Sequence, residues 1–454
     1  MATREFSLLP LGALLKTTSH VDRVLLPYYL VMHVWTAIGN GAVALRMLSV
    51  LAGAVTVAVS ARTAQIAWGS IAAVITGIAL AANGQFVGTS VDARPYALVL
   101  LFTAVATHSL VRIMSGPATR RAWLTYCAAV SIAVLMQALA ILILLPHAIP
   151  FWRRERRSLV SRWLLATTLP VLLTLVLVVG NSQRSQLAWI RRGSISDAIH
   201  NFITSSGESF HALPLILAVV FVLVLQVKRR FIDDVWAMSL GILIVPTAVL
   251  FLVSDLFTPV LVGRYVVSQL LGAALLLGAG GQFLSEVISS RHLARGLAAG
   301  MVIVVIVGAS FAGLRVTLRS TVAAGDNYPA LVRELTAQAR VGDELIIRQG
   351  YSLGGFADGV AYYLRDAAFM GAITQRLPNG EPSQYERIVD RTSPFSTANV
   401  QSGAYAANVW VVQKTQSATP TTQQLLAHGC VPIRVKGDRF QQFGAIFLLL
   451  FRCP

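Results

Sequence analysis

The stretch TSVDARPYALVLLFTAVATHSLVRIM, residues 89–114, indicates the class of fold. From Tyr96 onward it is almost continuously apolar, and about 20 such residues are enough to cross a bilayer. Asp92 and Arg94 stand directly before this run, and Pro95 separates them from it. The stretch therefore predicts a membrane-spanning helix with a charged pair at the edge of the membrane.

The composition of the whole chain agrees with a membrane protein. Of its 454 residues, 55% are hydrophobic and 13% are charged, whereas soluble domains carry about 25% charged residues. Residues 1–317 contain ten Asp and Glu, and residues 318–454 contain the other ten in less than half that length. We therefore expect a transmembrane domain over 42–317 and a water-exposed domain over 318–454.

The positive charge of the chain has a topological explanation. The formal net charge is +17, and many arginines stand in short loops such as WRRERRSLVSR (152–162) and VKRRF (227–231). Loops rich in Lys and Arg mark the cytoplasmic side of a membrane protein. This pattern needs no polyanionic partner, so we do not expect the protein to bind nucleic acid.

The apolar runs predict about ten spans. Residues 122–151 form one apolar stretch with arginines at both ends, and a single straight span would place those arginines on opposite faces. Two short helices broken near Gln137 return them to the same face, so we expect two. The expected spans are 42–62, 66–84, 96–114, 122–135, 137–151, 163–181, 212–227, 235–254, 259–281 and 296–317.

With these spans, the basic loops fall on the cytoplasmic side. The opposite side receives the 85–95 loop, the 182–211 loop, residues 254–259 and the C-terminal domain. It also receives residues 1–41, which we therefore expect to be an extracytoplasmic segment. Arg191 and Arg192 lie in that outer loop and break the positive-inside pattern. They are candidates for contacting an anionic ligand; the alternative is that they are solvated surface residues.

Three short elements in this order resemble a known family. They are VDRVLLPYYLVMHVWTAIGNGAVALRMLSVLAGAVTVA (21–58), DARPYAL (92–98) and PVLVGRYVV (259–267). Together they are similar to elements of polyprenyl-phosphate-sugar-dependent glycosyltransferases of the GT-C class. That class includes protein O-mannosyltransferase-like and aminoarabinose-transferase-like enzymes, and the present chain looks like the actinobacterial type. The 92–98 element is the most specific of the three.

The resemblance implies where the catalytic acid should be. In the family it lies in the first outer loop, just after the first span. The sequence ATREFSLL (2–9) looks like the part that normally follows this acid, so the first span and its acidic pair are expected to be missing here. Asp22 and Glu5 are then the candidates for the base that deprotonates the acceptor, since such a base must reach its hydroxyl. His20, Tyr28 and Tyr29 are candidates for contacting acceptor or donor.

The donor phosphate has four candidate ligands. Arg94 would neutralise the phosphate through its planar fork, and Asp92 would orient the phosphate or hold a divalent metal such as Mg²⁺ or Mn²⁺. The alternative is an interfacial pair that caps the 96–114 helix. Arg264 and Tyr265 stand about six residues into an expected span, where an unpaired charge costs roughly 2.5–3.5 kcal/mol, and a phosphate would be a suitable partner. Asp255 is an alternative partner.

The C-terminal domain alternates helix and strand patterns. We expect helices at 328–340 and at GVAYYLRD (359–366), and strands at 344–348, 407–413 and 444–453, which predicts a small α/β domain. Cys430 and Cys453 both fall in this domain and are candidates for a disulfide if it is extracytoplasmic. No catalytic pattern appears in it, so we interpret it as a structural or acceptor-binding lid.

Taken with the resemblance, the sequence predicts a glycosyltransferase in the cytoplasmic membrane. It would move mannose or a pentose from a polyprenyl-phosphate donor to a glycan, lipid or protein hydroxyl of the cell envelope on the outer face. No phosphate-binding loop or dinucleotide-binding loop is present, so no nucleotide cofactor is expected. The alternatives are a non-catalytic membrane subunit of the same fold and, less favoured, a secondary transporter, for which no internal repeat is seen.

Overall fold

The computed structural model describes residues 2–19, 23–179, 233–287, 328–339, 343–347, 374–375, 407–413, 420–434, 441–443 and 446–454, together with scattered positions between 196 and 227 and Gly308. The chain divides into two compact units. One unit is Pro10–Thr317, and the other combines Met1–Leu9 with Leu318–Pro454.

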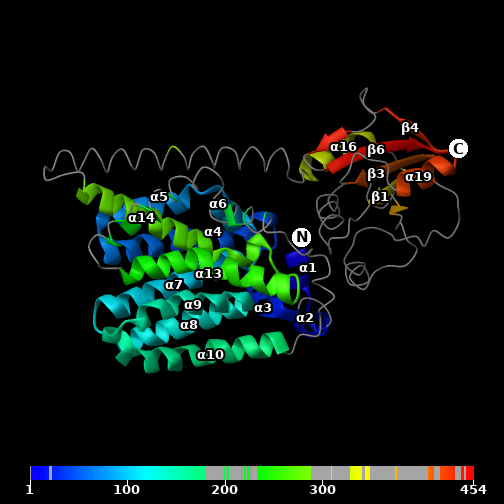
Figure 1. The fold of residues 1–454 in the computed structure, drawn as a ribbon. Helices are drawn as coiled ribbons and strands as arrows, with labels where there is room; N and C mark the ends of the chain where they lie inside the picture. Colours follow the sequence, from blue (N-terminus) through cyan, green and yellow to red (C-terminus); the bar gives the residue numbers. More distant parts are fainter. Residues whose placement is uncertain are drawn as a thin grey trace. The chain divides into compact units, whose positions relative to one another are not determined.

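The first of these units is helical (Figure 1). Its elements are α2 (Leu11–Thr18), η1 (Arg23–Leu25), α3 (Leu26–Trp35), α4 (Ala42–Trp68), α5 (Ser70–Ala81), α6 (Gly84–Val91), α7 (Tyr96–Ser115), α8 (Arg120–Met136), η2 (Ala138–Ile143), α9 (Leu144–Ala148), η3 (Ile149–Trp152), η4 (Arg154–Leu159), α10 (Val160–Val179), α13 (Asp234–Leu256), η6 (Gly263–Val266) and α14 (Ser268–Val287).

Fewer helices than expected meet the length and hydropathy of a span. Within the described part of the chain, four helical segments do so, at 42–68, 96–115, 154–178 and 234–256. The pair α5 and α6 adds a fifth if it counts as one span, although the two helices are bent by 62°. The chain is therefore a multi-pass membrane protein. The spans expected at 212–227 and 296–317 lie largely outside the described residues.

The boundary between the first two expected spans needs correction. Helix α4 continues to Trp68, six residues beyond the expected end of the first span, because no turn residue interrupts it before Gly69. Gly69 has a φ of 111°, a conformation that favours glycine, and the chain turns there into α5. The break at Gln137 is confirmed, since α8 ends at Met136 and Gln137 has an extended backbone.

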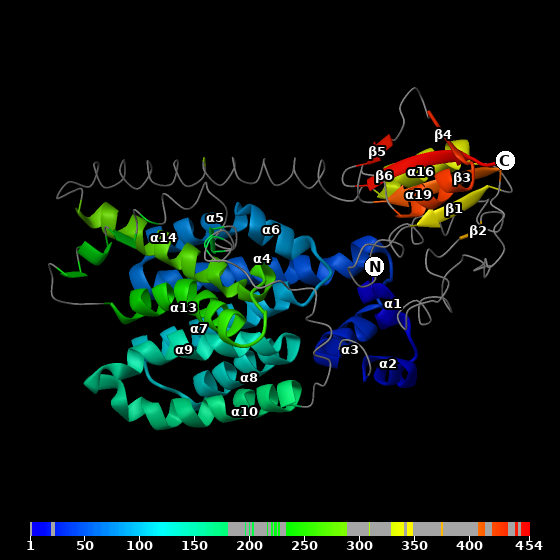
Figure 2. The same cartoon turned by 45° about the vertical axis from the view of Figure 1, so that its right-hand side comes forward.

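Small residues let the helices of this unit approach closely. A Cβ atom added at Gly278 of α14 would lie 2.2 Å from the Thr76 hydroxyl oxygen and 2.7 Å from the Ala72 carbonyl oxygen of α5. A Cβ at Gly272 would lie 2.7 Å from the Ser239 carbonyl oxygen of α13. Helices α5, α14 and α13 thus pack one against the next (Figures 1 and 2). Close packing through small residues is typical of membrane helices.

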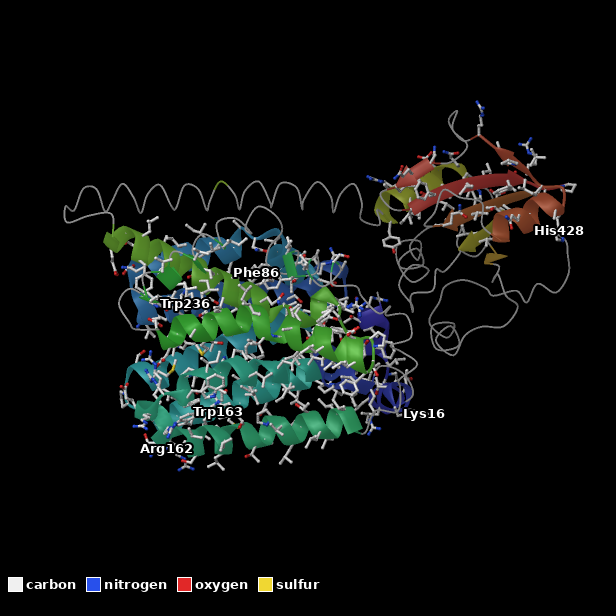
Figure 3. The ribbon with its side chains drawn as sticks, in the orientation of Figure 1. Lys16, Phe86, Arg162, Trp163, Trp236 and His428 are labelled. Atoms are coloured by element: carbon white, nitrogen blue, oxygen red, sulfur yellow. A yellow bond between two sulfur atoms is a disulfide. The ribbon has the colours of Figure 1, made fainter. Side chains whose placement is uncertain are left out.

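Two acidic residues, Asp233 and Asp234, connect the start of α13 to neighbouring elements of the helical unit. The Asp233 carboxylate accepts a hydrogen bond from the backbone N–H of Trp236, which caps α13, and another from Trp68 Nε1 of α4. Asp234 forms ion pairs with Arg153 and Arg156, each at 2.8 Å. Two acids at one helix start therefore tie it to α4 and to the basic loop that precedes α10. Figure 3 shows Trp236, Arg162 and Trp163 towards this end of the unit and Lys16 of α2 at the other.

A network of hydrogen bonds crosses the interior of the helical unit. Trp163 Nε1 donates to the Tyr126 hydroxyl at 3.1 Å, and that hydroxyl lies 3.2 Å from His147 Nδ1. His147 Nε2 lies 3.1 Å from the Thr107 hydroxyl, which donates to the Thr103 carbonyl. Every group is satisfied if His147 is neutral and carries its proton on Nε2. This hydrogen-bond network joins α7, α8, α9 and α10.

Replacing Tyr126 with phenylalanine is expected to lower stability by about 1–3 kcal/mol, because the half-buried Trp163 N–H and the buried His147 Nδ1 both lose their partner. Thermal unfolding of the detergent-solubilised protein measures this loss. Thr125→Val is the matched control, since the exposed Thr125 hydroxyl bonds only to a carbonyl of its own helix. Equal melting temperatures for the two variants would contradict the proposed network.

The second unit contains a mixed β-sheet, which confirms the small α/β region expected after residue 318. Its elements are α1 (Ala2–Leu8), α16 (Tyr328–Gln338), α19 (Pro420–Ala427), β1 (Glu344–Ile347), β2 (Thr374–Gln375), β3 (Asn408–Gln413), β4 (Val431–Ile433), β5 (Gln441–Phe443) and β6 (Ile446–Arg452). The strand order is β2-β1-β3-β6-β4, with β5 beside β6. Strand β1 runs parallel to its neighbours, whereas β6 runs antiparallel to β3, β4 and β5. The helix expected at 359–366 lies outside the described residues.

Two features fix this sheet. Buried Asp343 accepts hydrogen bonds from Trp410 Nε1 at 2.9 Å and from Asn408 Nδ2 at 3.1 Å, which joins the start of β1 to β3. Cys430 and Cys453 form a disulfide that links the residue before β4 to the residue after β6. Both cysteines are buried in the apolar core of the unit.

The double variant Cys430→Ser/Cys453→Ser is expected to lose about 2–4 kcal/mol of stability in this unit, because the disulfide joins residues 23 apart in sequence and limits the unfolded chain. Limited proteolysis in increasing urea, read from fragments of the C-terminal unit, measures the loss. Cys127→Ser in α8 serves as control, since Cys127 is a free cysteine. If the C-terminal fragments appear at the same urea concentration in both variants, the disulfide does not stabilise the unit.

Candidate functional site

The charged pair lies in a four-residue link between two helices. Helix α6 ends at Val91 and α7 begins at Tyr96, with Pro95 as its N-cap residue. The backbone N–H of Arg94 donates to the Asp92 carbonyl at 2.8 Å, which closes the link into a tight turn. Asp92 is exposed and Arg94 is half-buried. Proline restricts the chain before it to non-helical conformations, so the sequence itself separates the two helices here.

The surroundings of Arg94 favour its charged form. Burial lowers the pKa of the Arg94 guanidinium, whereas Tyr29 and then Asp92 raise it. Smaller contributions that also raise the pKa come from Tyr96 and Tyr28. The net pKa lies above the ordinary value. Arg94 is thus a permanent positive charge that is half withdrawn from water and bordered by aromatic side chains.

Tyr28 and Tyr29 reach this site from α3. Both are almost completely buried, and their ring centroids lie 6.0 Å apart. Because both rings are buried, neither lies on the outer surface of the helical unit. Trp35 at the end of α3 donates through Nε1 to the Ala44 carbonyl at 2.8 Å, which ties this helix to α4. The short helix α3 is therefore held in place at both its tyrosines and its last residue.

Arg264 and Tyr265 stand in η6, and their expected position needs correction. The sequence predicted Arg264 within a span that begins at 259, but the regular helix α14 begins only at Ser268. Pro259 and Gly263 favour an irregular chain, so Arg264 lies in the turn before the helix and is exposed. Its guanidinium carbon lies 5.7 Å from the centroid of the Tyr265 ring, a cation–π distance.

Tyr96 connects the two arginines. Its phenol group interacts electrostatically with Arg264 first, then with Tyr265, Arg94 and Asp92. Segments near residues 94 and 264, far apart in the sequence, thus meet at one phenol. Tyr28 and Tyr29 join them through their interactions with Arg94. Two guanidinium groups and one carboxylate gather there with tyrosine hydroxyls between them. Such a set binds an anion with several oxygen acceptors, because Arg offers paired donors in a fixed geometry.

The remaining expected residues cannot be placed. His20, Asp22, Arg191 and Arg192 lie outside the described residues. Glu5 belongs to α1, and its side chain is likewise not described. The roles expected for these five residues stay predictions.

The described residues do not fit a metal centre. Among them, no three His, Cys, Asp or Glu side chains gather closely enough to hold a metal ion. Mg²⁺ and Mn²⁺ prefer several oxygen ligands, commonly carboxylates. The charged neighbour of Asp92 identified here is instead Arg94. We therefore derive no step through a metal.

Sequence reasoning assigned no role to the side chains of two polar residues, Tyr96 and Gln137. Tyr96 was part of the 92–98 element but had no assigned role, and its position directly after Pro95 was the only signal. Gln137 was expected only as the place of a helix break. Its side chain is buried, and neither amide atom has a hydrogen-bond partner in the part of the chain that the structure describes.

Part of the chain is similar to a known protein family. Residues 22–180 match the family described as dolichyl-phosphate-mannose-protein mannosyltransferase. This match includes α3, the Asp92–Arg94 turn and the break at Gln137, and it ends before η6. Over these residues the resemblance to polyprenyl-phosphate-sugar-dependent glycosyltransferases is confirmed. No curated protein sequence matches the chain.

Two crystal structures share the fold. The apo state of ArnT from Cupriavidus metallidurans is 15% identical, with a TM-score of 0.54, over 93% of this chain and 86% of that one. ArnT from the same organism bound to undecaprenyl phosphate is 14% identical, with a TM-score of 0.51, over 93% of this chain and 87% of that one. At this identity the likeness establishes an ArnT-like fold. The actinobacterial type and the missing first span stay predictions.

Proposed function

We propose that this protein is an inverting glycosyltransferase that uses a polyprenyl-phosphate sugar as donor. The lipid would lie along the membrane helices, with its phosphate against Arg94 and Arg264. The acceptor would be a hydroxyl of a cell-envelope glycan, lipid or protein on the outer face of the cytoplasmic membrane. Mannose or a pentose would be the sugar transferred.

The convergence of Arg94 and Arg264 around Tyr96 carries this proposal. Arg94 stands just before the span at 96–115, and Arg264 lies in the link that follows the span at 234–256. We therefore expect both charges at the edge of the membrane, where the phosphate of a membrane lipid resides. Charge-assisted hydrogen bonds from guanidinium groups to phosphate are among the strongest in proteins. The fold shared with an ArnT structure that contains undecaprenyl phosphate supports the same class of ligand.

The proposed reaction needs one base and one leaving group. An acidic residue removes the proton of the acceptor hydroxyl, and the oxygen attacks the anomeric carbon on the face opposite the phosphate. The bond between that carbon and the phosphate oxygen breaks, which releases polyprenyl phosphate and inverts the configuration. The two guanidinium groups stabilise the negative charge that develops on the leaving phosphate.

Asp22 is the preferred candidate for the base, and Glu5 is the second. Asp22 directly precedes η1, and η1 and α3 both contact α8. The position of Asp22 in the sequence, shortly before Tyr28 and Tyr29 of α3, supports this choice, because these tyrosines interact with Arg94. His20, Arg191 and Arg192 remain candidates for contacting the acceptor or the donor.

Transfer of labelled sugar tests the proposed function. Membranes that contain the protein are supplied with radiolabelled undecaprenyl phosphomannose or undecaprenyl phosphopentose, and label in cell-envelope glycan, lipid and protein is counted. We expect transfer above that of membranes without the protein, and its loss in the Arg94→Ala/Arg264→Ala variant. Donor binding without transfer would favour the alternative, a non-catalytic membrane subunit of the same fold.

A further inference from the structure

The break between α8 and η2 contains an unusual polar group. Gln137 is 6% exposed, and neither its Nε2 nor its Oε1 has a hydrogen-bond partner within the described ranges. A buried amide without partners costs free energy, so such a group in a native protein calls for an explanation. Its backbone already makes the bonds of the break, from its N–H to the Ala133 carbonyl and from the Ala140 N–H to its own carbonyl. The side chain is therefore not needed to form the break.

The elements on either side of Gln137 lead to the two halves of the proposed phosphate site. Before it, α8 contacts α3, which carries Tyr28 and Tyr29. After it, η2 contacts η6, and Leu139 and Leu142 pack in one apolar cluster with Tyr265. Gln137 is thus the junction in the chain between an element that contacts α3 and an element that packs against η6.

The chemistry of the amide restricts what it can bind. Nε2 donates hydrogen bonds and Oε1 accepts them, so a complete partner must supply both an acceptor and a donor. A phosphate diester at neutral pH supplies only acceptors and is already matched by the two arginines. Hydroxyl groups of a sugar supply both, and two neighbouring hydroxyls fit the two ends of one amide.

We propose that Gln137 hydrogen-bonds hydroxyl groups of the donor sugar and contributes to sugar specificity. This inference rests on the proposed function, because it takes the donor to be a glycosylated polyprenyl phosphate. Gln137 is a binding and specificity residue in this account, with no role in proton transfer. The energetic cost of its buried amide in the free protein is offset when the sugar is bound.

A pair of lipids that differ only in the sugar tests the inference. Affinity for undecaprenyl phosphate and for undecaprenyl phosphomannose or phosphopentose is measured with wild type and with Gln137→Met, which keeps the volume and removes the amide. Wild type should bind one glycosylated lipid more tightly than undecaprenyl phosphate. In Gln137→Met we expect affinity for that lipid to fall by roughly 10-fold or more, with affinity for undecaprenyl phosphate unchanged.

Stability of the lipid-free protein provides the second readout. Because Gln137→Met removes a buried amide that has no hydrogen-bond partner among the described residues, its melting temperature should equal or exceed that of wild type. Ser131→Ala is the matched control, since Ser131 lies on the same helix, is buried and also has no hydroxyl partner among the described residues. It should leave the difference between the two lipids intact.

Three outcomes would overturn the inference. If Gln137→Met binds both lipids more weakly by the same factor and melts at a lower temperature, Gln137 has a structural role. If its affinities for both lipids are unchanged, the amide makes no hydrogen bond to the sugar. Both outcomes leave the proposed function standing, provided that Arg94→Ala still weakens binding of both lipids. If wild type binds neither lipid, the proposed function fails, and the role of Gln137 fails with it.

Discussion

Replacing Arg94 with alanine is expected to lower the rate of sugar transfer by about 100- to 1,000-fold. Removal of one preorganised donor that stabilises developing charge costs an enzyme about this much. Arg94 fits such a role because it is half-buried, keeps its positive charge and borders Tyr29 and Asp92. The loss should appear in kcat as well as KM, because the phosphate gains negative charge as the sugar leaves.

Two further variants show whether the paired N–H donors of Arg94 or only its positive charge is needed for sugar transfer. Arg94→Lys keeps the charge but loses the paired donors, so we expect an intermediate loss of about 10- to 100-fold. Arg162→Ala is the control for net charge, since Arg162 is an exposed arginine at the start of α10, at the opposite end of the helical unit from α2 (Figure 3). Transfer by Arg94→Ala at the rate of Arg162→Ala would remove Arg94 from the site.

Replacing Gly278 with alanine is expected to destabilise the helical unit by about 1–3 kcal/mol or more, a large effect for one methyl group. The new Cβ would lie 2.2 Å from the Thr76 hydroxyl oxygen and 2.7 Å from the Ala72 carbonyl oxygen. The Thr76 side chain can rotate, but the carbonyl belongs to the backbone of α5, so α5 and α14 would have to separate. Melting temperature and the yield of monodisperse protein in detergent measure the effect.

Gly88→Ala is the matched control, for which we expect no loss of stability. Gly88 lies in α6, and no described atom lies within 4 Å of a Cβ added there. Alanine favours a helix over glycine by about 1 kcal/mol, so this variant should be as stable as wild type or slightly more so. If both alanine variants melt at the same temperature, the close contact of α5 and α14 is not a determinant of stability.

Much of this fold could be predicted because the membrane restricts the choices. Apolar length identified α7 and α13, and the arginines at both ends of 122–151 required the break that the structure has at Gln137. In the C-terminal unit, the patterns at 344–348, 407–413 and 444–453 correspond to β1, β3 and β6. Apolar runs cannot show where a helix starts inside them, which is why Arg264 was expected within a span and lies instead in a turn.

The site could be predicted only in part. The Asp92–Arg94 turn and Arg264 were recognisable because charges beside apolar runs are conspicuous. Their meeting around Tyr96 could not be derived, since it depends on how α3, α7 and η6 pack. Gln137 could not be predicted as a site residue for the same reason. The sequence does not show whether the amide of a glutamine in an apolar run has a hydrogen-bond partner, because that depends on how the neighbouring elements pack.

The central claim is that Arg94 and Arg264 together hold the phosphate of a membrane lipid. Binding of undecaprenyl phosphate and of undecaprenol, which lacks the phosphate, tests it most directly in wild type, each single alanine variant and the double variant. We predict that wild type prefers the phosphate by about 100-fold or more, that each single variant loses about 10- to 100-fold of affinity for it, and that the double variant binds both lipids alike. Equal affinity of wild type for the two lipids, or an unchanged preference in the double variant, would contradict the account.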